Sequence, residues 1–448
     1  MQDAPLIGPY HPDDVLAWEP DGPRTARRFL SDVARLAASL PDRLAVLNLL
    51  SSRYEFLVGF AAAMVRGHVT LLPQSRAPQT LRRIAGEHRE SYCLTNPGEP
   101  VDGVESMHLA STGGTAPWPA RMPHVPLDRV VAIAFTSGST GQPVPNKKTW
   151  RALTSVAAAT GARLGVKPGQ PTAVVATVPH QHMFGLEASV MLPIMHGAVM
   201  HAGRPLFPAD IRDALAQVQG MRILVTTPLH LRACVADAVQ LPPVDVILSA
   251  TAPLSRTLAE ASERQCRTKV HEIFGFAEAG SIAERRTVAG DHWRLLEGVQ
   301  LVQTDDRWTV RTDYLPAPVP VPDRLTVEAD GRFVVHGREA DQINVAGHRV
   351  ALGDLNQKLL EIDGVQDGVF VLPDERAETV TRLMACVVAP GKTADDIHRA
   401  LRTRIDPVFL PRPLLLVPKL PRNDTGKLPR EVLLRFIEQY MEHPAHDA

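Results

Sequence analysis

The sequence predicts an α/β fold built in layers around a largely parallel sheet. Before residue 100, amphipathic stretches such as Thr25 to Leu40 alternate with short apolar runs such as Leu44 to Leu50. Alternation of this kind favours parallel strands that are covered by helices. A chain of 448 residues can also form two or three domains around a large core. We therefore expect a layered α/β fold with more than one domain.

The elements expected before residue 165 follow from apolar spacing and from glycine. Tyr54 to Arg66 has helical spacing and precedes Gly67, a residue type that commonly follows the end of a helix. Thr112 to Pro126 is rich in glycine and proline and is expected to be a loop. A further helix is expected from Trp150 onward. The other expected elements are a helix at Thr80 to His88 and strands at Val69 to Leu72, Ser91 to Leu94 and Val130 to Phe135.

Beyond residue 170 the pattern is dominated by short apolar runs. Leu315 to Pro322 carries alternating prolines, which cannot donate in a central strand, so an extended edge or a linker is expected. Thr393 is the expected N-cap of a helix from Ala394 to Arg404. The expected strands are Thr172 to Val178, Arg222 to Thr227, Val244 to Ser249, Asp306 to Thr312, Val369 to Leu372 and Leu383 to Val388.

The composition is that of an ordinary globular protein, with 44% apolar and 22% charged residues. The net charge of −1 gives no electrostatic footprint for nucleic acid or an anionic membrane. The four cysteines lie far apart, which argues against a disulfide framework and suits a reducing cytoplasm. No signal peptide or membrane span is indicated. We expect a cytoplasmic monomer or weak homodimer.

A loop of small residues follows the apolar run at Val130 to Phe135. Glycine tolerates positive φ, and clustered N–H and hydroxyl groups can cradle a phosphate before a helix. The pattern is neither the Walker loop, because Pro143 stands where Gly-Lys is needed, nor a dinucleotide fingerprint. A flexible surface loop is the alternative. The candidate phosphate-binding residues are Thr136, Ser137, Gly138, Ser139, Thr140 and Gly141.

The order Thr-Ser-Gly-Ser-Thr-Gly-x-Pro resembles the phosphate loop of the adenylate-forming superfamily. Its members include acyl-CoA and aryl-CoA synthetases, nonribosomal-peptide adenylation domains and luciferases, which make an acyl-adenylate from a carboxylic acid and ATP. Further matching segments occur in order up to Lys427. The resemblance implies a large layered α/β N-terminal domain of the acyl-CoA synthetase type at residues 1–338 and a small α+β C-terminal lid at 339–448. It also implies ATP and Mg²⁺ as cofactors.

The stretch from Pro179 to Gly185 resembles the family's Pro-x-x-His-x-x-Gly stretch beside the carboxylic acid substrate. We call this stretch the acid segment. The resemblance implies that His182, Phe184 and Gly185 bind the acid and that His182 takes part in catalysis. Two alternatives remain. The His180-x-His182 pair could bind a metal, although no third ligand is apparent, or the segment could be a plain turn with solvated histidines.

The stretch from Ser249 to Leu254, which we call the nucleotide turn, has small residues directly after an expected strand. Parallel sheets open ligand crevices at the carboxyl ends of their strands. The family places the nucleotide base against a similar turn. By resemblance Thr251 and Ala252 contact the nucleotide and Ser249 contacts the acid, with a simple tight turn as the alternative.

The stretch His271 to Glu278 resembles the family's aromatic-Gly-x-Thr-Glu motif. By that resemblance Phe274 stacks on adenine, with Glu272 and Gly275 among the nucleotide-binding residues, and Glu278 is catalytic by holding Mg²⁺. Magnesium prefers one or two carboxylates together with phosphate oxygens, so a single glutamate is chemically reasonable. Ala277 replaces the threonine of the motif. A solvated surface glutamate is the alternative.

Asp323 and Arg338 stand where the family binds the ribose hydroxyls. A carboxylate can accept both hydroxyl donors, although a turn aspartate is the alternative and Val321-Pro322 replaces the usual Thr-Gly. The following stretch, up to Val350, resembles the family's hinge, with the hinge expected near Ala340 or Asp341. The resemblance implies a thiol channel past Gly347 and Arg349, while Asn344 replaces a common lysine.

The lysine loop, Leu420 to Lys427, is close to the family's catalytic-lysine motif Pro-Arg/Lys-Asn/Thr-x-x-Gly-Lys. A solvated lysine is the alternative for Lys427 taken alone. The resemblance implies that Lys427 bridges the carboxylate and the α-phosphate of ATP during in-line attack. A general base is unnecessary because the acid is already ionised near neutral pH. Val144 occupies the position of the lysine that usually follows the phosphate loop, and Lys147 or Lys148 could substitute.

The expected substrate is a small aromatic carboxylate, such as a hydroxybenzoate. His182 and Phe184 could form a flat-walled pocket. The stretch from Arg53 to Leu72 also looks similar to stand-alone 4-hydroxybenzoate ligases of aryl-polyene and xanthomonadin pigment pathways, which load an aryl acid onto a carrier protein. No Asp-Ser-Leu carrier signature occurs, so an acyl carrier protein would bind in trans. CoA is the alternative acceptor, which Asn344 to Arg349 favours. The rival functions are a non-catalytic adenylate-binding protein and an amide-forming ligase.

Overall fold

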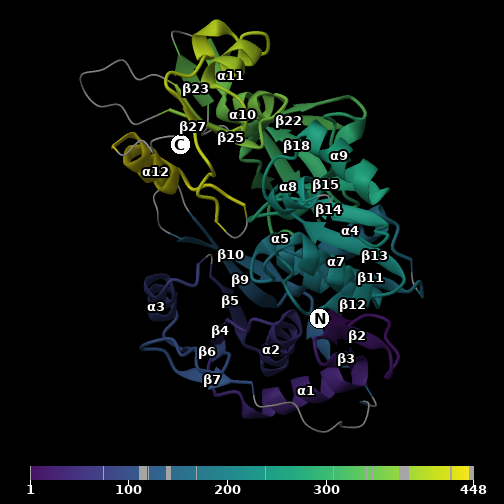
Figure 1. Ribbon diagram of the computed structural model, residues 1–448. Helices are drawn as coiled ribbons and strands as arrows, with labels where there is room; N and C mark the ends of the chain where they lie inside the picture. The colour runs from purple at the N-terminus through teal and green to yellow at the C-terminus, as the bar shows by residue number, and fades with distance from the viewer. Residues whose placement is uncertain are drawn as a thin grey trace.

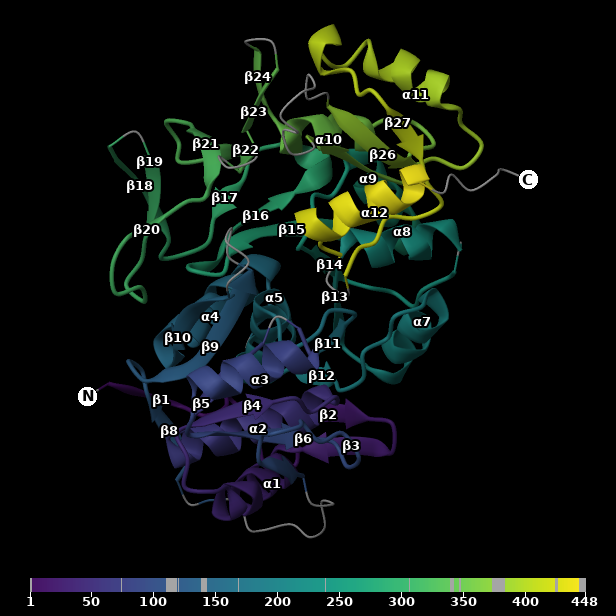
Figure 2. The same ribbon diagram turned by 90° about the vertical axis from the view of Figure 1, so that its left-hand side faces the viewer.

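The structure is a computed structural model that describes residues 2–73, 75–109, 119, 121–137, 143–167, 169–237, 239–305, 307–338, 342–345, 348–372, 383–423 and 426–442. Figures 1 and 2 show a large N-terminal part of layered sheets and helices, with a smaller C-terminal unit next to one end of it.

The first sheet is mainly parallel, because only its edge strand β10 joins antiparallel to its neighbour. Strand β4 (Ala45–Asn48), near the centre of this sheet, is buried at all four of its positions. This burial is expected for a parallel strand that is covered on both faces. In spatial order the six strands are β10 (Pro143–Thr149), β9 (Val130–Ser137), β5 (Val69–Leu72), β4 (Ala45–Asn48), β6 (Ser91–Thr95) and β7 (Ser106–His108).

The second sheet has a parallel centre with antiparallel strands at both edges. The carboxyl ends of its central strands meet along one edge, where open α/β sheets bind ligands. In spatial order the nine strands are β17 (Arg294–Leu295), β16 (Gly280–Arg286), β15 (Lys269–Phe276), β14 (Val246–Ser249), β13 (Met221–Thr226), β11 (Thr172–Ala176), β12 (Val199–His201), β2 (Val15–Glu19) and β3 (Gly22–Thr25).

Helix α2 (Arg53–Arg66) has a capping residue at each end. The Ser52 hydroxyl accepts from the first free N–H groups of α2, and Gly67 closes that helix with φ of 80°. A π-helical segment at Glu187–Met191 lies between α5 and α6. The helices are α1 (Ala26–Ser39), α2 (Arg53–Arg66), α3 (Pro78–Glu87), α4 (Trp150–Leu164), α5 (Met183–Leu186), α6 (Leu192–His196), α7 (Pro208–Gln217), α8 (Pro228–Ala236) and α9 (Arg256–Cys266).

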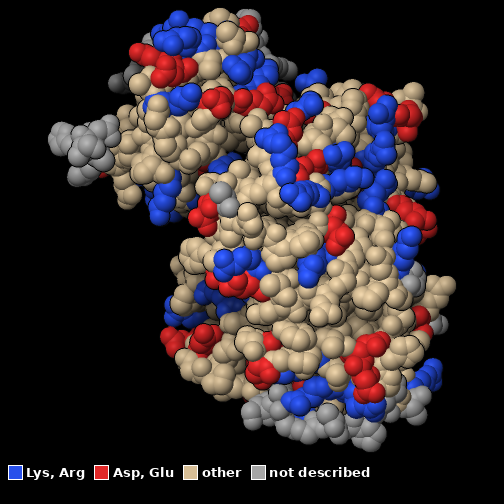
Figure 3. All heavy atoms as spheres, turned by 45° about the vertical axis from the view of Figure 1, so that its right-hand side comes forward, with Lys and Arg blue, Asp and Glu red and all other residues tan. Residues whose placement is uncertain are grey.

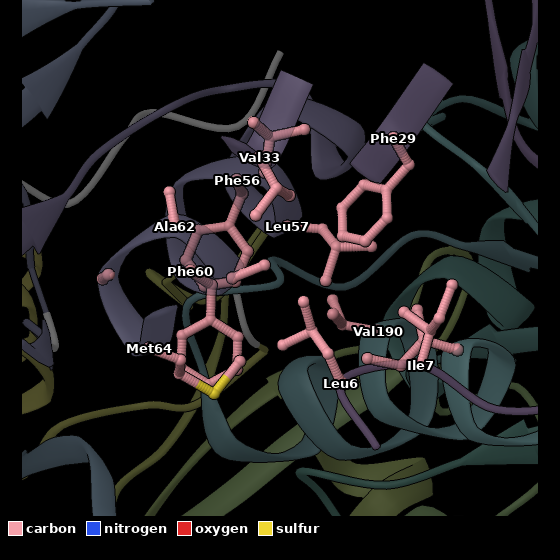
Figure 4. Close-up of a cluster of buried hydrophobic side chains, with 14 of the residues drawn as sticks. Leu6, Ile7, Phe29, Val33, Phe56, Leu57, Phe60, Ala62, Met64 and Val190 are labelled. Atoms are coloured by element: carbon pink, nitrogen blue, oxygen red, sulfur yellow. The ribbon is translucent and has the colours of Figure 1, made fainter. Parts of the chain in front are cut away.

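One apolar core joins residues of both sheets to α1, α2 and the π-helical segment. Figure 4 shows Phe29 of α1, Leu57 and Phe60 of α2, and Val190 of the π-helical segment around one another, next to Leu6. Helix α2 is buried on nearly every side, which explains why its sequence is apolar all round rather than amphipathic.

A β-rich region follows the second sheet and packs around the buried rings of Trp293 and Phe333. It consists of two small sheets, β18 (Gln300–Thr304), β19 (Arg307–Arg311) and β20 (Val319–Pro320) in one, and β21 (Asp323–Val327) and β22 (Phe333–Arg338) in the other. Near the N-terminus β1 (Asp3–Pro5) pairs with β8 (His124–Pro126).

The C-terminal unit has its own hydrophobic cores on the two faces of a short sheet. In β26, Ala385 and Val387 face one core and Met384, Cys386 and Val388 face the other, which is the period of two expected for a strand. Its elements are the hairpin β23 (Gln342–Val345) and β24 (His348–Ala351), α10 (Leu352–Leu360), β25 (Asp367–Val371), β26 (Met384–Val388), α11 (Ala394–Leu401), β27 (Leu414–Leu416) and α12 (Arg430–Glu442).

The predicted α/β fold class is confirmed. Two local expectations needed correction. His124–Pro126, expected within a loop, forms β8 because it pairs with the N-terminal strand. Strand β10 precedes the helix at Trp150, where the sequence suggested only a loop, because residues 143–149 pair back onto β9. The alternating prolines end in an edge strand, β20, as expected.

The surface carries both signs of charge, as the net charge of −1 implies. Lysine, arginine, aspartate and glutamate side chains are interspersed over the face shown in Figure 3. Among the described residues, no helix combines the length and apolarity needed to cross a membrane.

Candidate active site

The lysine loop is closed on itself by Asn423. The backbone N–H of Lys427 donates to Oδ1 of Asn423 at 2.9 Å, and the N–H of Gly426 donates to the Asn423 carbonyl at 2.8 Å. Gly426 has φ of 77°, a conformation that suits glycine. The Lys427 side chain is exposed. A short asparagine-braced turn therefore presents this lysine.

The lysine loop rests on the N-terminal part of the chain. A Cβ atom added to Gly426 would lie 3.9 Å from Oγ1 of Thr227 and 3.9 Å from Oγ1 of Thr251. Thr227 follows β13 and Thr251 follows β14, so the loop lies at the carboxyl ends of the central strands. The fold thus brings Lys427 to the edge where the sequence places the nucleotide turn.

Arg422 anchors the lysine loop within the C-terminal unit. Its Nε lies 2.7 Å from Oδ2 of Asp367, and its Nη2 lies 2.8 Å from Oδ1. A third bond runs from its Nη1 to the Gly426 carbonyl at 2.9 Å. Bidentate arginine–carboxylate pairs fix orientation as well as distance. Arg232 of α8 faces this pair from the N-terminal part, and burial lowers the pKa of its guanidinium.

The nucleotide turn is a strained connection at the end of β14. Thr251 has φ of 78°, a left-handed conformation that costs a β-branched residue about 1–3 kcal/mol. Ser249 is fully buried, and among the described residues its hydroxyl has no hydrogen-bond partner. Ala252 is half-buried beside it. Strain and an unused buried hydroxyl are both typical of a binding site.

Glu272 holds the nucleotide turn in place. Its carboxylate is buried, accepts the Leu254 N–H at 3.0 Å and the Thr287 hydroxyl at 3.1 Å, and pairs with Arg285 at 2.8 Å. The chain's own groups therefore use both carboxylate oxygens, and the glutamate supports the turn from behind.

We expect Glu272→Gln to destabilise the fold by about 3 kcal/mol, because the change removes the nearer and more buried of the two carboxylates that pair with Arg285, whose side chain is only 10% exposed. Chemical unfolding would measure the loss. Glu260→Gln is the control, since Glu260 forms only an exposed pair with Arg256 and should cost less than about 0.5 kcal/mol. Equal unfolding free energies for the two variants would show that Glu272 has no supporting role.

The adenine-binding motif lies at the end of β15. The half-buried ring of Phe274 packs against Trp293 at 5.5 Å and Phe333 at 5.9 Å between ring centroids. Gly275 is exposed, and a Cβ atom there would lie 2.4 Å from the Gly280 carbonyl. The glycine is thus required by the close pairing of β15 with β16, and one side of Phe274 is occupied by other rings.

Residues 277–279, which we call the metal turn, join β15 to β16. They include Glu278, whose side chain is exposed. Among the described residues, no group of three or more histidine, cysteine, aspartate and glutamate side chains is arranged to hold a metal. One exposed carboxylate fits a magnesium ion that takes its other ligands from phosphates and water. Ala277 offers no hydroxyl at the position where the family has threonine.

Asp323 and Arg338 lie directly opposite each other in the β21–β22 pair, so the fold brings their backbones together. Asp323 begins its strand after the turn that contains Val321 and Pro322, and it is half-buried. The side chain of Arg338 lies outside the described part of the structure.

The acid segment turns sharply before α5. His182 is the half-buried N-cap residue of that helix, and Phe184 packs against the apolar core behind β11. A Cβ atom on Gly185 would lie 1.9 Å from the Pro179 carbonyl, so this position admits only glycine without movement. The tight approach explains the Pro-x-x-His-x-x-Gly spacing.

His180 differs from His182 in its burial and in its hydrogen bonding. Its Nε2 lies 3.0 Å from the Leu50 carbonyl, which can only accept, so this nitrogen carries the proton. Burial, followed by the charge of Arg53, holds the pKa of His180 well below its ordinary value. The ring is therefore neutral, with its Nε2 engaged. The metal-pair interpretation gains no support, because the part of the chain that the structure describes brings no third ligand to the two histidines.

Arg53 is a structural residue that sequence reasoning did not identify. It is 1% exposed, and burial lowers its pKa to about 9. Its donors bind the Ser189 hydroxyl and the carbonyls of Ala176, Val178, His201 and Gly203. One guanidinium thus ties the ends of β11 and β12 to the π-helical segment behind the acid segment.

Several predicted site residues lie outside the described residues, wholly or in their side chains. For Thr136 and Ser137 the backbone pairs with β10, and Arg349 lies in β24. Gly138, Ser139, Thr140, Gly141 and Gly347, together with the hinge residues Ala340 and Asp341, are not described.

Two further charged residues adjoin the metal turn. Nζ of Lys148 donates to the Glu278 carbonyl at 3.0 Å. The carboxylate of Glu187 accepts from the Ser281 N–H and hydroxyl. Burial lowers the pKa of Lys148 and raises that of Glu187. A charged residue within an apolar stretch is the one sequence signal that could have drawn attention to Glu187.

The comparisons with known proteins agree with this geometry. The model of the AMP-binding enzyme family matches residues 11–307, over half of the chain. The 4-coumarate–CoA ligase of Rhodobacter capsulatus is 30% identical over 275 residues, which are 61% of this chain and 67% of that protein.

Two solved structures show the same fold. The O-succinylbenzoate coenzyme A synthetase of Bacillus subtilis, in complex with AMP, has a TM-score of 0.81 at 16% identity, covering 96% of this chain and 98% of its own. An anthranilate CoA ligase in complex with anthranoyl-AMP has a TM-score of 0.79 at 15% identity, covering 96% and 94%. The family match over residues 11–307 establishes that this chain belongs to the AMP-binding enzymes, ligases that activate a carboxylic acid as its adenylate.

Proposed function

We propose that the enzyme adenylates a small aromatic, hydroxybenzoate-like acid and transfers the acyl group to the phosphopantetheine thiol of an acyl carrier protein. The observation that carries the adenylation geometry is the contact of the lysine loop with Thr227 and Thr251. This closeness supports a site at the carboxyl ends of β11, β14 and β15, which the acid segment, the nucleotide turn and the metal turn follow.

The proposed roles follow from position and charge. Lys427 neutralises charge between the acid carboxylate and the α-phosphate, which is electrostatic stabilisation by a preorganised group. Asp323 and Arg338 hold the ribose, while Phe274 and the nucleotide turn hold the base. Bound magnesium on Glu278 would neutralise charge on the phosphates.

The two half-reactions are proposed to use different arrangements of residues 1–338 and 339–448. In the arrangement described here the lysine loop contacts the nucleotide turn, which suits adenylation. Thiol transfer past Gly347 and Arg349 would require Lys427 to withdraw, so a rotation near Ala340 or Asp341 forms part of the proposal.

The aromatic acid is supported by the acid segment and by the relatives. His182 and Phe184 lie in the acid segment, and the buried Ser249 hydroxyl offers one hydrogen bond. Three of the similar proteins are ligases for coumarate, O-succinylbenzoate and anthranilate, all acids with an aromatic ring.

The acceptor has two candidates. A carrier protein in trans is proposed from the similarity of Arg53 to Leu72 to pigment-pathway ligases. Free CoA is the second candidate, favoured by the Asn344 to Arg349 pattern and by relatives named as CoA ligases.

A cytoplasmic location is also proposed. The four cysteines are free thiols, which suits a reducing compartment.

ATP–pyrophosphate exchange with benzoates and with C2 to C12 fatty acids would test the acid. We expect exchange with 4-hydroxybenzoate or a close relative and little with aliphatic acids. Transfer from the preferred acid would then be measured to CoA and to a holo carrier protein. Preference for an aliphatic acid rejects the aromatic proposal, and turnover with CoA alone rejects the carrier proposal. Nucleotide binding without exchange for any acid would favour the non-catalytic alternative.

A further inference from the structure

The metal turn is held from two sides by buried charged residues. We propose that Lys148 and Glu187 are positioning residues that clamp this turn so that Glu278 can meet a nucleotide-bound magnesium ion. The inference rests on the proposed role of Glu278 and assigns a function to two residues that do not themselves reach the metal.

Lys148 approaches the turn from the first sheet. It lies on β10 and is 3% exposed, whereas Lys147, one position earlier on the same strand, is exposed. Its Nζ donates to the Glu278 carbonyl at 3.0 Å, across 130 residues of sequence. Burying an ammonium group is costly unless it is paired and hydrogen-bonded, and the carboxylates of Glu187 and Glu278 supply opposing charge.

Glu187 approaches the same turn from the acid segment. It begins the π-helical segment directly after α5 and is 5% exposed. Its Oε2 accepts the Ser281 N–H at 3.1 Å and the Ser281 hydroxyl at 2.6 Å. A Cβ atom on Gly280 would lie 2.6 Å from Oε1, and Gly280 has φ of 82°. The chain leaving the metal turn is therefore fitted closely around this carboxylate.

Together the two contacts hold the middle of the turn and the start of the strand that leaves it. Lys148 holds the backbone of Glu278 itself, and Glu187 holds Gly280 and Ser281 at the start of β16. Magnesium demands near-octahedral geometry, so a single carboxylate ligand must be accurately placed. Groups that orient a metal ligand typically contribute about 10- to 100-fold in metal affinity or activity. Glu187 also links the turn to the acid segment, which ends two residues before it at Gly185.

The position of Lys148 gives a physical reason why Val144 can replace the lysine that usually follows the phosphate loop in the family. The side chain of Val144 is 44% exposed and turned to solvent, so no cation is offered there. Lys148 instead brings its charge to the metal turn from further along β10. Of the two candidate lysines, only Lys148 has the buried contact that a positioning residue needs.

The test compares Lys148→Met with Lys147→Met. Magnesium-dependent ATP binding is measured by titration calorimetry, and the magnesium concentration for half-maximal ATP–pyrophosphate exchange is measured with the preferred acid. We expect Lys148→Met to raise that concentration about 10- to 100-fold, with little change in the acid KM. Lys147→Met should behave as the wild type. Unchanged magnesium dependence in a folded Lys148→Met enzyme overturns the inference.

A second variant keeps the test decisive if Lys148→Met does not fold. The double variant Lys148→Met, Glu187→Gln removes both buried charges together, which is less damaging than leaving one unpaired. It should fold and still show the raised magnesium requirement, and wild-type dependence in it also overturns the inference. Failure of the wild type to bind ATP or catalyse exchange would instead reject the proposed function.

Discussion

Lys427→Ala should lower the rate of adenylate formation by about 100- to 1000-fold, because one preorganised charge is lost at the developing transition state. Lys427 is exposed on a loop whose backbone is held by Asn423, so removal of its side chain should leave the fold and ATP binding nearly intact. Single-turnover formation of the adenylate is the appropriate measurement, since it isolates this step from thiol transfer.

Lys419→Ala provides the matched control for this prediction. Lys419 is another exposed lysine on the same segment, and its loss should leave single-turnover adenylation unchanged. A Lys427→Ala enzyme that forms adenylate at the wild-type rate would remove Lys427 from the mechanism, whatever its effect on the later transfer.

We expect Arg422→Met to lower the rate of adenylate formation by about 10- to 100-fold, although Arg422 acts through the lysine loop and not on the reacting atoms. Arg422 joins Asp367 through two bonds and the Gly426 carbonyl through a third. Loss of these bonds frees the lysine loop to shift, and a misplacement of about 1 Å can cost about 100-fold in rate. Rate and thermal unfolding would be measured together to separate positioning from stability.

Two companion variants sharpen that result. Arg422→Lys keeps the charge but cannot form the bidentate pair, so only partial recovery is expected. Arg430→Met removes an exposed arginine of the same unit, which binds the Leu372 carbonyl, and should leave adenylation near the wild-type rate. Full activity in Arg422→Met would mean that the loop needs no anchor beyond Asn423.

Local sequence was sufficient for the fold class and for the location of most candidate site residues. Apolar periodicity reports directly on the faces that a helix or strand must bury, and this is why the α/β alternation was predicted. The motifs around Lys427, Glu278 and Asp323 are short and continuous, so their resemblance to the family can be recognised from residue order alone. The register that sets Asp323 opposite Arg338 agrees with their expected partnership.

Only the tertiary structure decided which charges support those motifs. Lys148 and Glu278 are 130 residues apart, Glu187 and Ser281 are 94 apart, and Arg422 and Asp367 are 55 apart. Periodicity within a segment carries no information about the distant group that compensates a buried charge. That choice depends on how the sheets and the C-terminal unit meet, because burial makes an unpaired charge costly only once the chain has folded around it.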